Sequence, residues 1–198
     1  MNRVGVERSA PTFILYQQKC PWQGSLSWAF NTAEPTMAHD LQLIEITSEM
    51  VGMVAPLFDA YRQFYGQPPD LDGARQFLSE RLQRGESVIF AVIEGENALG
   101  FTQLYPSFSS VSMKPIWILN DLFVTEKARR RGIGARLLKA ARDHALQTGA
   151  VRLVLSTGVE NAAAKALYEE TGWQKDMAFL HFKLELSRPA SSTAEEEP

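Results

Sequence analysis

Residues 116–149 read IWILNDLFVTEKARRRGIGARLLKAARDHALQTG, and their pattern decides the fold. The apolar run from Ile116 to Val124 predicts a strand. Residues 132–148 predict an amphipathic helix that ends at Gly149, because apolar side chains recur along it at helical spacing. A second apolar strand is predicted at 151–156. A strand, helix, strand passage of this length implies a parallel pair joined by a right-handed crossover.

The flanking sequence adds further strands and helices to this unit. A strand is predicted at 41–46, followed by two helices before Gly85. Runs 87–94 and 99–107 surround Gly95-Glu96-Asn97, which predicts a hairpin. Further elements are a helix at 161–171 and a last alternating strand, 179–186. The expected order is β-α-α-β-β-β-α-β-α-β-β.

Composition limits the class of protein. The chain has 198 residues and a formal net charge of -3, which disfavours a nucleic-acid partner. No apolar run approaches the ~20 residues of a membrane span, and the single cysteine, Cys20, favours a reducing, cytoplasmic location.

We expect an unpatterned N-terminal extension at 1–36, one domain at 37–187 and a disordered tail at 188–198; Met37 is an alternative start.

The loop Arg129-Arg130-Arg131-Gly132-Ile133-Gly134 lies where a strand ends and a helix begins. Free N–H groups in a first helical turn, the helix dipole and nearby glycines form a site for an anion such as pyrophosphate. The spacing lacks the lysine of a P-loop, and Leu137 replaces the third glycine of a dinucleotide fingerprint. The alternative is a basic loop that only caps the helix, although three arginines are unfavourable at that end of the dipole.

With Leu122-Phe123-Val124 before it, this R-x-x-G-x-G loop resembles the acetyl-CoA pyrophosphate loop of the GCN5-related N-acetyltransferases (GNAT). Residues 161–173, NAAAKALYEETGW, are similar to the family segment N-x-x-A-x-x-(L/F)-Y-x-x-x-G-(F/W). The resemblance spans about Leu41 to Leu186. It implies an α/β (α+β) GNAT fold: a mixed, mostly antiparallel sheet of six to seven strands, with a central parallel pair splayed at the cofactor cleft and helices on both faces.

The resemblance also implies direct transfer of an acetyl group from acetyl-CoA to an amine. Tyr168 would protonate the departing thiolate, as a phenol can, whereas its alternative role is core packing. Asn161 would contact the pantetheine or the adjoining loop. The residues expected to bind the cofactor are Leu122, Phe123, Val124, Arg129, Arg130, Arg131, Gly132, Ile133, Gly134, Ala135, Asn161 and Tyr168.

The acceptor side rests on a second resemblance. Asn120-Asp121-Leu122-Phe123-Val124 is similar to a pattern of polyamine and related small-amine acetyltransferases, with Asn120 in place of their glutamate. Asp121 is the candidate base or a group that grips a cationic acceptor; the alternative is a hydrogen-bonded strand-end carboxylate. Residues 61–66 resemble the fungal histone and polyamine branch, so Tyr61 and Tyr65 join Asn120 and Asp121 as expected acceptor contacts, with packing as their alternative role.

These patterns predict an acetyltransferase for a primary amine, with a polyamine-like or lysine-like small molecule favoured. A non-catalytic acyl-CoA-binding module and a protein lysine or N-terminal acetyltransferase are the alternatives. No metal site is expected, because His39, His144 and His181 lie far apart in the chain. The alternating segment 179–186 could form the edge of a homodimer.

Overall fold

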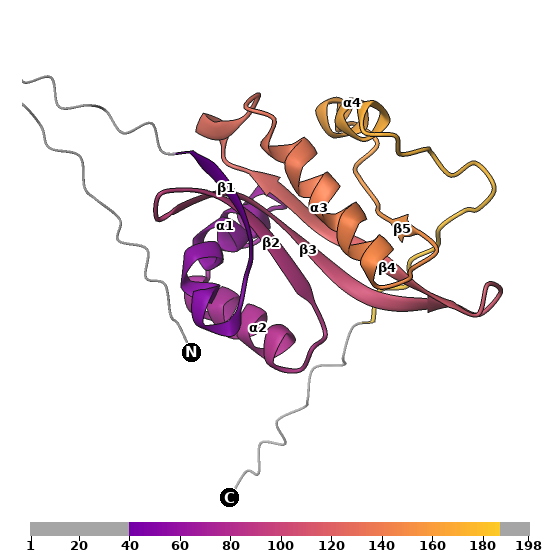
Figure 1. Ribbon diagram of the computed structural model, residues 1–198, viewed down its shortest axis with the longest axis horizontal. Coiled ribbons are helices and arrows are strands. Elements are labelled where there is room, and N and C mark those ends of the chain that lie inside the picture. The colour runs from indigo at the N-terminus through magenta and orange to yellow at the C-terminus, as the bar shows by residue number, and fades with distance from the viewer. Residues whose placement is uncertain (1–39, 187–198) are drawn as a thin grey trace, which may run out of the picture. The chain divides into compact units, whose positions relative to one another are not determined.

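The computed structural model describes residues 40–186 and contains a five-stranded sheet with helices on both faces (Figure 1). The strand order is β1-β2-β3-β4-β5, which follows the chain. The strands are β1 (Leu41–Glu45), β2 (Val88–Glu94), β3 (Asn97–Ser109), β4 (Lys114–Val124) and β5 (Leu153–Val154). The helices are α1 (Val51–Phe64), α2 (Leu71–Gln83), α3 (Ile133–Gln147) and α4 (Ala162–Glu170), with short 3-10 turns η1 (Ser48–Met50) and η2 (Glu126–Ala128).

The pairing of the strands confirms the mixed sheet. Strands β1 to β4 pair antiparallel in sequence order, and β4 pairs with β5 in parallel. Helix α3 is the crossover between the two parallel strands, and the apolar face expected for it is buried. The strand–helix–strand prediction and the hairpin at Gly95 are therefore confirmed.

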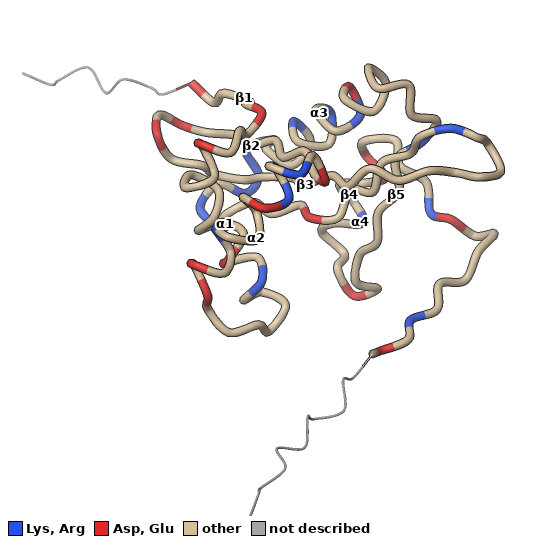
Figure 2. The backbone as a smooth tube through the Cα atoms, turned by 90° about the horizontal axis from the view of Figure 1, so that it is seen from below, with Lys and Arg blue, Asp and Glu red and all other residues tan. Residues whose placement is uncertain are grey.

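Two hydrophobic cores lie on opposite faces of the sheet. Figure 2 shows α3 on one side of the strands and α1 and α2 on the other. Phe101 and Ile89 belong to the core beneath α1 and α2. Leu104 and Leu119 belong to the core beneath α3, against which Leu167 of α4 also packs. Burial of both faces explains why the central strands read as nearly continuous apolar runs.

A β-bulge at Asn120 decides how β4 presents its side chains. Gln103 of β3 pairs with Asp121, but the next residue, Leu104, pairs with Leu119, so Asn120 is the extra residue. In a regular strand Leu119 and Asp121 would share a face. The bulge instead places Leu119 toward α3 and Asp121, with Gln103, toward α1 and α2.

The parallel pair is short and opens at the bulge. Only Trp117 and Ile118 of β4 pair with β5, and both precede Asn120. Beyond the bulge, the residues of β4 up to Val124 have no strand beside them on that edge within the described part of the chain. The backbone of this part of β4 is consequently available to a ligand rather than to a neighbouring strand.

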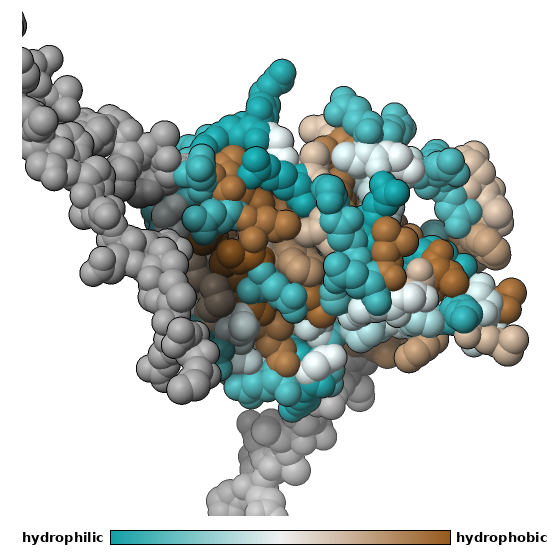
Figure 3. All heavy atoms as spheres, in the orientation of Figure 1, coloured by the Kyte–Doolittle hydropathy of each residue, from teal (hydrophilic) through white to brown (hydrophobic). Residues whose placement is uncertain are grey.

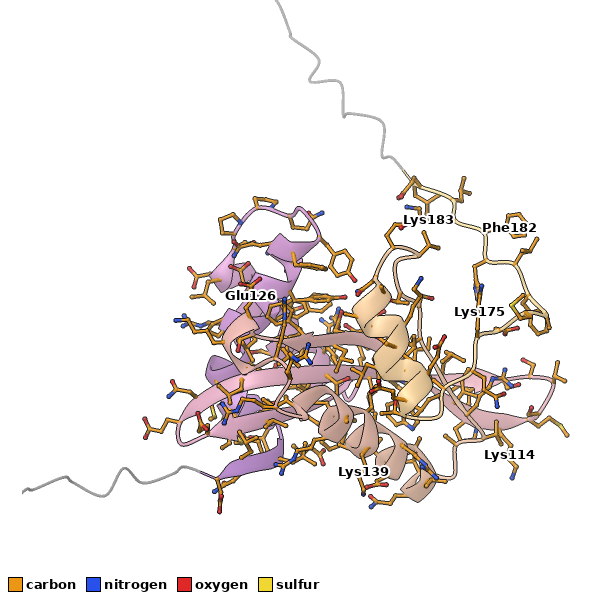
Figure 4. All side chains as sticks on the ribbon, turned by 90° about the horizontal axis from the view of Figure 1, so that it is seen from above. Lys114, Glu126, Lys139, Lys175, Phe182 and Lys183 are labelled. Carbon is orange, nitrogen blue, oxygen red and sulfur yellow. The ribbon has the colours of Figure 1, made fainter. Side chains whose placement is uncertain are left out.

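The prediction of a last strand at 179–186 is wrong. Within the described residues the sheet has five strands instead of the six or seven expected. Residues 179–186 form no ladder, and Phe182 is 90% exposed. Figure 4 shows Phe182 and Lys183 on the extended chain that follows α4. An alternating segment forms a strand only where it can pair with the edge of a sheet. The edge strand here, β5, has two residues, Leu153 and Val154, instead of the six expected at 151–156, so it gives segment 179–186 little to pair with.

Other apolar side chains are exposed at the tip of the β3–β4 hairpin. Figure 3 shows hydrophobic atoms on the surface there, and Phe108, Val111 and Met113 are all largely exposed. Met113 also has a positive φ of 48°, as expected in a tight turn. None of these residues contacts the site described below.

The expected extension at 1–36 lies outside the described residues, and so does the expected tail at 188–198. Within the described part of the chain, no helix is long and apolar enough to cross a membrane.

Candidate active site

The loop before α3 has the backbone geometry of an anion site. Arg129 is extended, with φ -60° and ψ 157°, whereas Arg130 and Gly132 have positive φ values of 61° and 75°. Alternation of this kind turns successive N–H groups toward one point. Gly132 is the N-cap of α3 and has no side chain to occupy the first-turn N–H groups. A positive φ is also costly for the non-glycine Arg130, which is typical of functional loops.

A cavity of about 830 Å³ brings together most of the predicted site. It lies between α1, the second half of β4, the start of α3 and helix α4. Predicted residues that line it are Tyr61, Tyr65, Asn120, Leu122, Phe123, Val124, Arg129, Arg130, Gly132, Ile133, Gly134, Ala135, Asn161 and Tyr168. Two predicted residues, Asp121 and Arg131, are not among those that line it.

Tyr168 enters the cavity from α4. Burial raises the pKa of its hydroxyl above the usual value, with a smaller contribution from Tyr65 across the cavity; Thr157 partly offsets the shift. Its ring also packs 6.1 Å from the ring of Trp173, centroid to centroid. A phenol with a raised pKa keeps its proton at neutral pH, so Tyr168 can act as a proton donor.

Asp121 lies under the cavity and is 3% exposed. Burial raises the pKa of its carboxyl group to about 6, and the neighbouring Tyr61 hydroxyl and Asn120 amide limit that rise. Asn120 Nδ2 donates a hydrogen bond of 3.1 Å to Asp121 Oδ1. Asp121 does not line the cavity, so it can exchange a proton with a ligand there only through a side chain that does.

Tyr61 is that residue. It lines the cavity, and burial together with the negative charge of Asp121 raises the pKa of its hydroxyl well above the usual value. Weaker effects from Tyr65 and Tyr168 act on the same hydroxyl. Tyr61 thus connects the tyrosines in the cavity to the buried carboxyl group of Asp121.

Arg131 has a structural partner outside the cavity. Its Nη2 lies 2.5 Å from Oε1 of Glu94, at the end of β2, so the guanidinium ties the loop to the sheet. Arg129 is held by the carbonyl of Val124 at 3.4 Å and pairs with Glu126 at 3.6 Å. Arg130 has no ion pair with another described residue, so its charge is available to a ligand.

Asn161 fixes the start of α4. Its Oδ1 accepts a hydrogen bond of 3.1 Å from the Ala164 N–H group, which is the geometry of an N-cap. Since Asn161 also lines the cavity, this cap determines how α4 presents Tyr168. The capping role belongs to the motif itself and needs no ligand.

Sequence reasoning missed several residues of the site. Ser156 and Thr157 line the cavity just after β5, and Phe64 does so from α1. Ser156 and Thr157 could have been found from the sequence, because ligands commonly bind at the carboxyl ends of parallel strands. Gln103, buried opposite Asp121, gave no signal beyond being polar in an apolar run.

Comparisons with known proteins agree with this geometry. The family model "Acetyltransferase (GNAT) family" matches residues 50–173. The uncharacterized N-acetyltransferase YhfO of Bacillus subtilis (strain 168) is 54% identical over 131 residues, which are 66% of this chain and 88% of that protein. Aminoglycoside N(6')-acetyltransferase type 1 of Klebsiella aerogenes is 30% identical over 100 residues, 50% of this chain and 66% of that protein.

A solved structure supports the same assignment. The crystal structure of a probable acetyltransferase has a TM-score of 0.71 at 43% identity and covers 75% of this chain and 99% of its own. The fold class expected from the sequence is therefore confirmed, although these matches do not single out the polyamine and histone branch. The chain belongs to the acetyltransferase (GNAT) family and is an N-acetyltransferase that uses acetyl-CoA.

Proposed function

We propose that this enzyme acetylates a primary amine of a small, cationic molecule, polyamine-like or lysine-like, by direct transfer. One observation carries the proposal: a single cavity has an anion-binding loop at one end and three tyrosines, with a buried carboxyl group beneath, at the other. The first end suits a diphosphate, and the second suits proton transfer from an amine.

The residues of the cavity fit acetyl-CoA. The first-turn N–H groups of α3 from Ile133 to Ala135 and the side chains of Arg129 and Arg130 would hold the diphosphate. From Leu122 to Val124, the edge of β4 opposite β3 has no strand beside it in the described chain, and it would hold the pantetheine and polarise the acetyl carbonyl through backbone N–H groups. When bound, acetyl-CoA supplies the acetyl group as a thioester.

Tyr168 serves as the general acid in this proposal. Its hydroxyl carries a proton at neutral pH, and it can donate this proton to the sulfur while negative charge develops there. The proton would leave from Tyr168 Oη as the carbon–sulfur bond breaks.

Asp121 serves as the general base, acting through Tyr61. An alkylammonium has a pKa of about 10, so the acceptor must lose a proton before it attacks. Tyr61 Oη would accept that proton while its own proton moves to a carboxylate oxygen of Asp121. Asn120 donates to Asp121 and does not accept, so in this role it orients the base instead of replacing it.

Aromatic side chains favour a cationic acceptor. Tyr61, Phe64 and Tyr65 line the acceptor end of the cavity, and aromatic faces attract ammonium groups. The similarity to an aminoglycoside acetyltransferase is consistent with this choice, because aminoglycosides carry several primary amines.

The test is release of coenzyme A thiol from acetyl-CoA with spermidine, lysine, kanamycin and a lysine-containing peptide. Fastest turnover of spermidine or lysine supports the proposal, whereas kanamycin as the best acceptor moves the substrate class to aminoglycosides. Preference for the peptide favours a protein acetyltransferase. If coenzyme A binds but no amine is acetylated, the non-catalytic module that Asn120 suggests replaces the proposal.

We also propose a homodimer and a cytoplasmic location. The exposed alternating residues of segment 179–186 supply an apolar edge for a second copy. The single cysteine, Cys20, suits a reducing compartment.

A further inference from the structure

Gln103 is an unusual residue for the centre of a sheet. It is completely buried in β3, and neither its Oε1 nor its Nε2 has a hydrogen-bond partner among the described residues. Asp121 Oδ2 is likewise buried and unpartnered in the described part of the chain. Buried polar side-chain atoms are nearly always paired in proteins, so three unpaired atoms at one place require a reason.

The strand register places these atoms together. Gln103 and Asp121 are directly opposite each other in the β3–β4 ladder, so their side chains project from the same face of the sheet. The β-carbons of such a pair are about 5 Å apart, within reach of one hydrogen bond between an amide and a carboxyl group. The bulge at Asn120 creates this juxtaposition, because it sets Asp121 on the face of Gln103.

Among the described residues, no cationic side chain compensates the charge of the Asp121 carboxylate. The groups that face Asp121 are the hydroxyls of Tyr61 from α1 and Tyr105 from β3, and the pKa of each is raised by the carboxylate as well as by burial. Arg81 of α2 acts on Tyr105 but is not among the groups that shift Asp121. Besides the Tyr61 hydroxyl and the Asn120 amide, the Gln103 amide is the donor that the strand register places opposite the carboxylate.

We propose that Gln103 is the positioning residue of Asp121: its amide N–H group holds Oδ2, which keeps the carboxyl group ionised and turned toward Tyr61. The two groups are not hydrogen-bonded to each other in this structure, so the proposal requires the amide to turn toward Oδ2. The proposal rests on the role of Asp121 as the base in the proposed function. An apolar side chain of the same size would pack more simply here, so glutamine has a purpose other than packing.

The first experiment measures the pKa of Asp121 without relying on turnover. Protein labelled with 13C at aspartate Cγ is titrated by NMR, and Asp121→Asn identifies the resonance. Gln103→Met removes the donor and should raise the pKa of Asp121 by about one pH unit. Gln103→Glu places a second carboxyl group opposite and should raise the higher apparent pKa of the pair further, because the last proton is shared between the two carboxyl groups.

Thr102→Val is the matched control. Thr102 is an equally buried neighbour whose hydroxyl donates to the backbone oxygen of Asp121 at 2.9 Å, so its loss should leave the carboxyl pKa unchanged. An Asp121 pKa that stays the same in both Gln103 variants overturns the proposal. An equal shift in Thr102→Val also overturns it, because the effect is then general loosening of the sheet.

Turnover separates this proposal from the proposed function. The pH dependence of kcat/KM, which reports ionisations of the free enzyme, is measured for Gln103→Met with spermidine or kanamycin, whichever is acetylated. If the acidic side of the pH–rate profile shifts by the same amount as the NMR pKa of Asp121, the result supports both Gln103 as the positioning residue and Asp121 as the base. A shifted NMR pKa with an unshifted pH–rate profile keeps Gln103 as the partner of Asp121 and rejects Asp121 as the base.

Discussion

Two aspartates of this domain are buried in opposite surroundings. Asp59 accepts hydrogen bonds from Arg62 at 3.0 Å, Gln63 at 2.9 Å and the Asp70 N–H group at 2.9 Å. Asp121 has only neutral partners among the described residues, the Asn120 amide at 3.1 Å and the Tyr61 hydroxyl, and burial outweighs both in their effect on its pKa. A buried carboxylate with several donors stabilises the fold, whereas one with few donors lowers stability when it is charged.

Asp121→Asn should therefore stabilise the protein at high pH. Burial raises the folded-state pKa of Asp121 to about 6, above the ~3.9 of an unfolded chain, so the folded state binds this proton more tightly. The resulting stability is fully present below about pH 4 and is lost as the pH rises through 6. Replacement by Asn should add up to roughly 3 kcal/mol to the free energy of unfolding at pH 8 and almost nothing at pH 4.

Urea unfolding of Asp121→Asn at both pH values checks this expectation. Asp59→Asn is the matched control and should destabilise by about 1–3 kcal/mol at pH 8, because it disturbs a satisfied network. Destabilisation by Asp121→Asn at pH 8 would show that the carboxylate is better paired than its surroundings indicate.

Tyr168→Phe should lower kcat by about 100-fold and leave the affinity for acetyl-CoA within about twofold. The hydroxyl is needed when the thiolate departs, so its loss affects the transition state more than binding. Steady-state kinetics and calorimetry measure the two quantities. Tyr65→Phe, in the same cavity, is the control and should keep most of the turnover. Full activity of Tyr168→Phe excludes this residue as the acid.

Arg130 and Arg131 should differ as ligand contacts although they are adjacent. Arg130→Ala should weaken coenzyme A binding about tenfold, because Arg130 lines the cavity and forms no ion pair within residues 40–186. Arg131→Ala should leave affinity within about twofold, since its guanidinium is engaged by Glu94. Calorimetry at two salt concentrations measures both variants. The opposite ranking would mean that the loop rearranges when the ligand binds.

At the scale of elements, the turn into α3 depends on one left-handed residue. Gly132→Ala should cost roughly 1 kcal/mol, because φ is 75° and an added methyl group meets nothing within 4 Å. It should also weaken coenzyme A binding severalfold, since the strain acts on the N–H groups that face the cavity. Thermal unfolding and calorimetry give the two values.

Gly85→Ala is the matched control for that experiment. Gly85 follows α2 with φ 63°, has the same open surroundings and lies outside the cavity. It should lose similar stability and keep its affinity for coenzyme A. Equal loss of affinity in both variants would assign the effect to general destabilisation.

At the scale of the whole molecule, segment 179–186 is the expected contact between two copies. Phe182→Asp should convert a dimer to a monomer in light scattering, because Phe182 is 90% exposed and belongs to the apolar side of the alternation. His181→Asp, on the other side of the same segment, should leave the dimer intact. A monomeric wild-type protein refutes the homodimer.

Local patterns determined the part of the site that is contiguous in the chain. The loop at 129–134, the amphipathic α3 and the α4 motif with Asn161 and Tyr168 were predictable, because caps, glycine turns and helical spacing act over a few residues. The same local rule failed at 179–186, where alternation without a partner edge gave no strand.

Contacts between distant segments were decided only by the tertiary structure. The bulge at Asn120 reverses the side on which Asp121 lies, and register then brings it to Gln103, 18 positions earlier. The ion pair of Arg131 with Glu94 likewise depends on how the β2–β3 hairpin meets the loop. Register and packing are set by the whole sheet, so the sequence could name the anion loop and the acid but not which side chains surround the base.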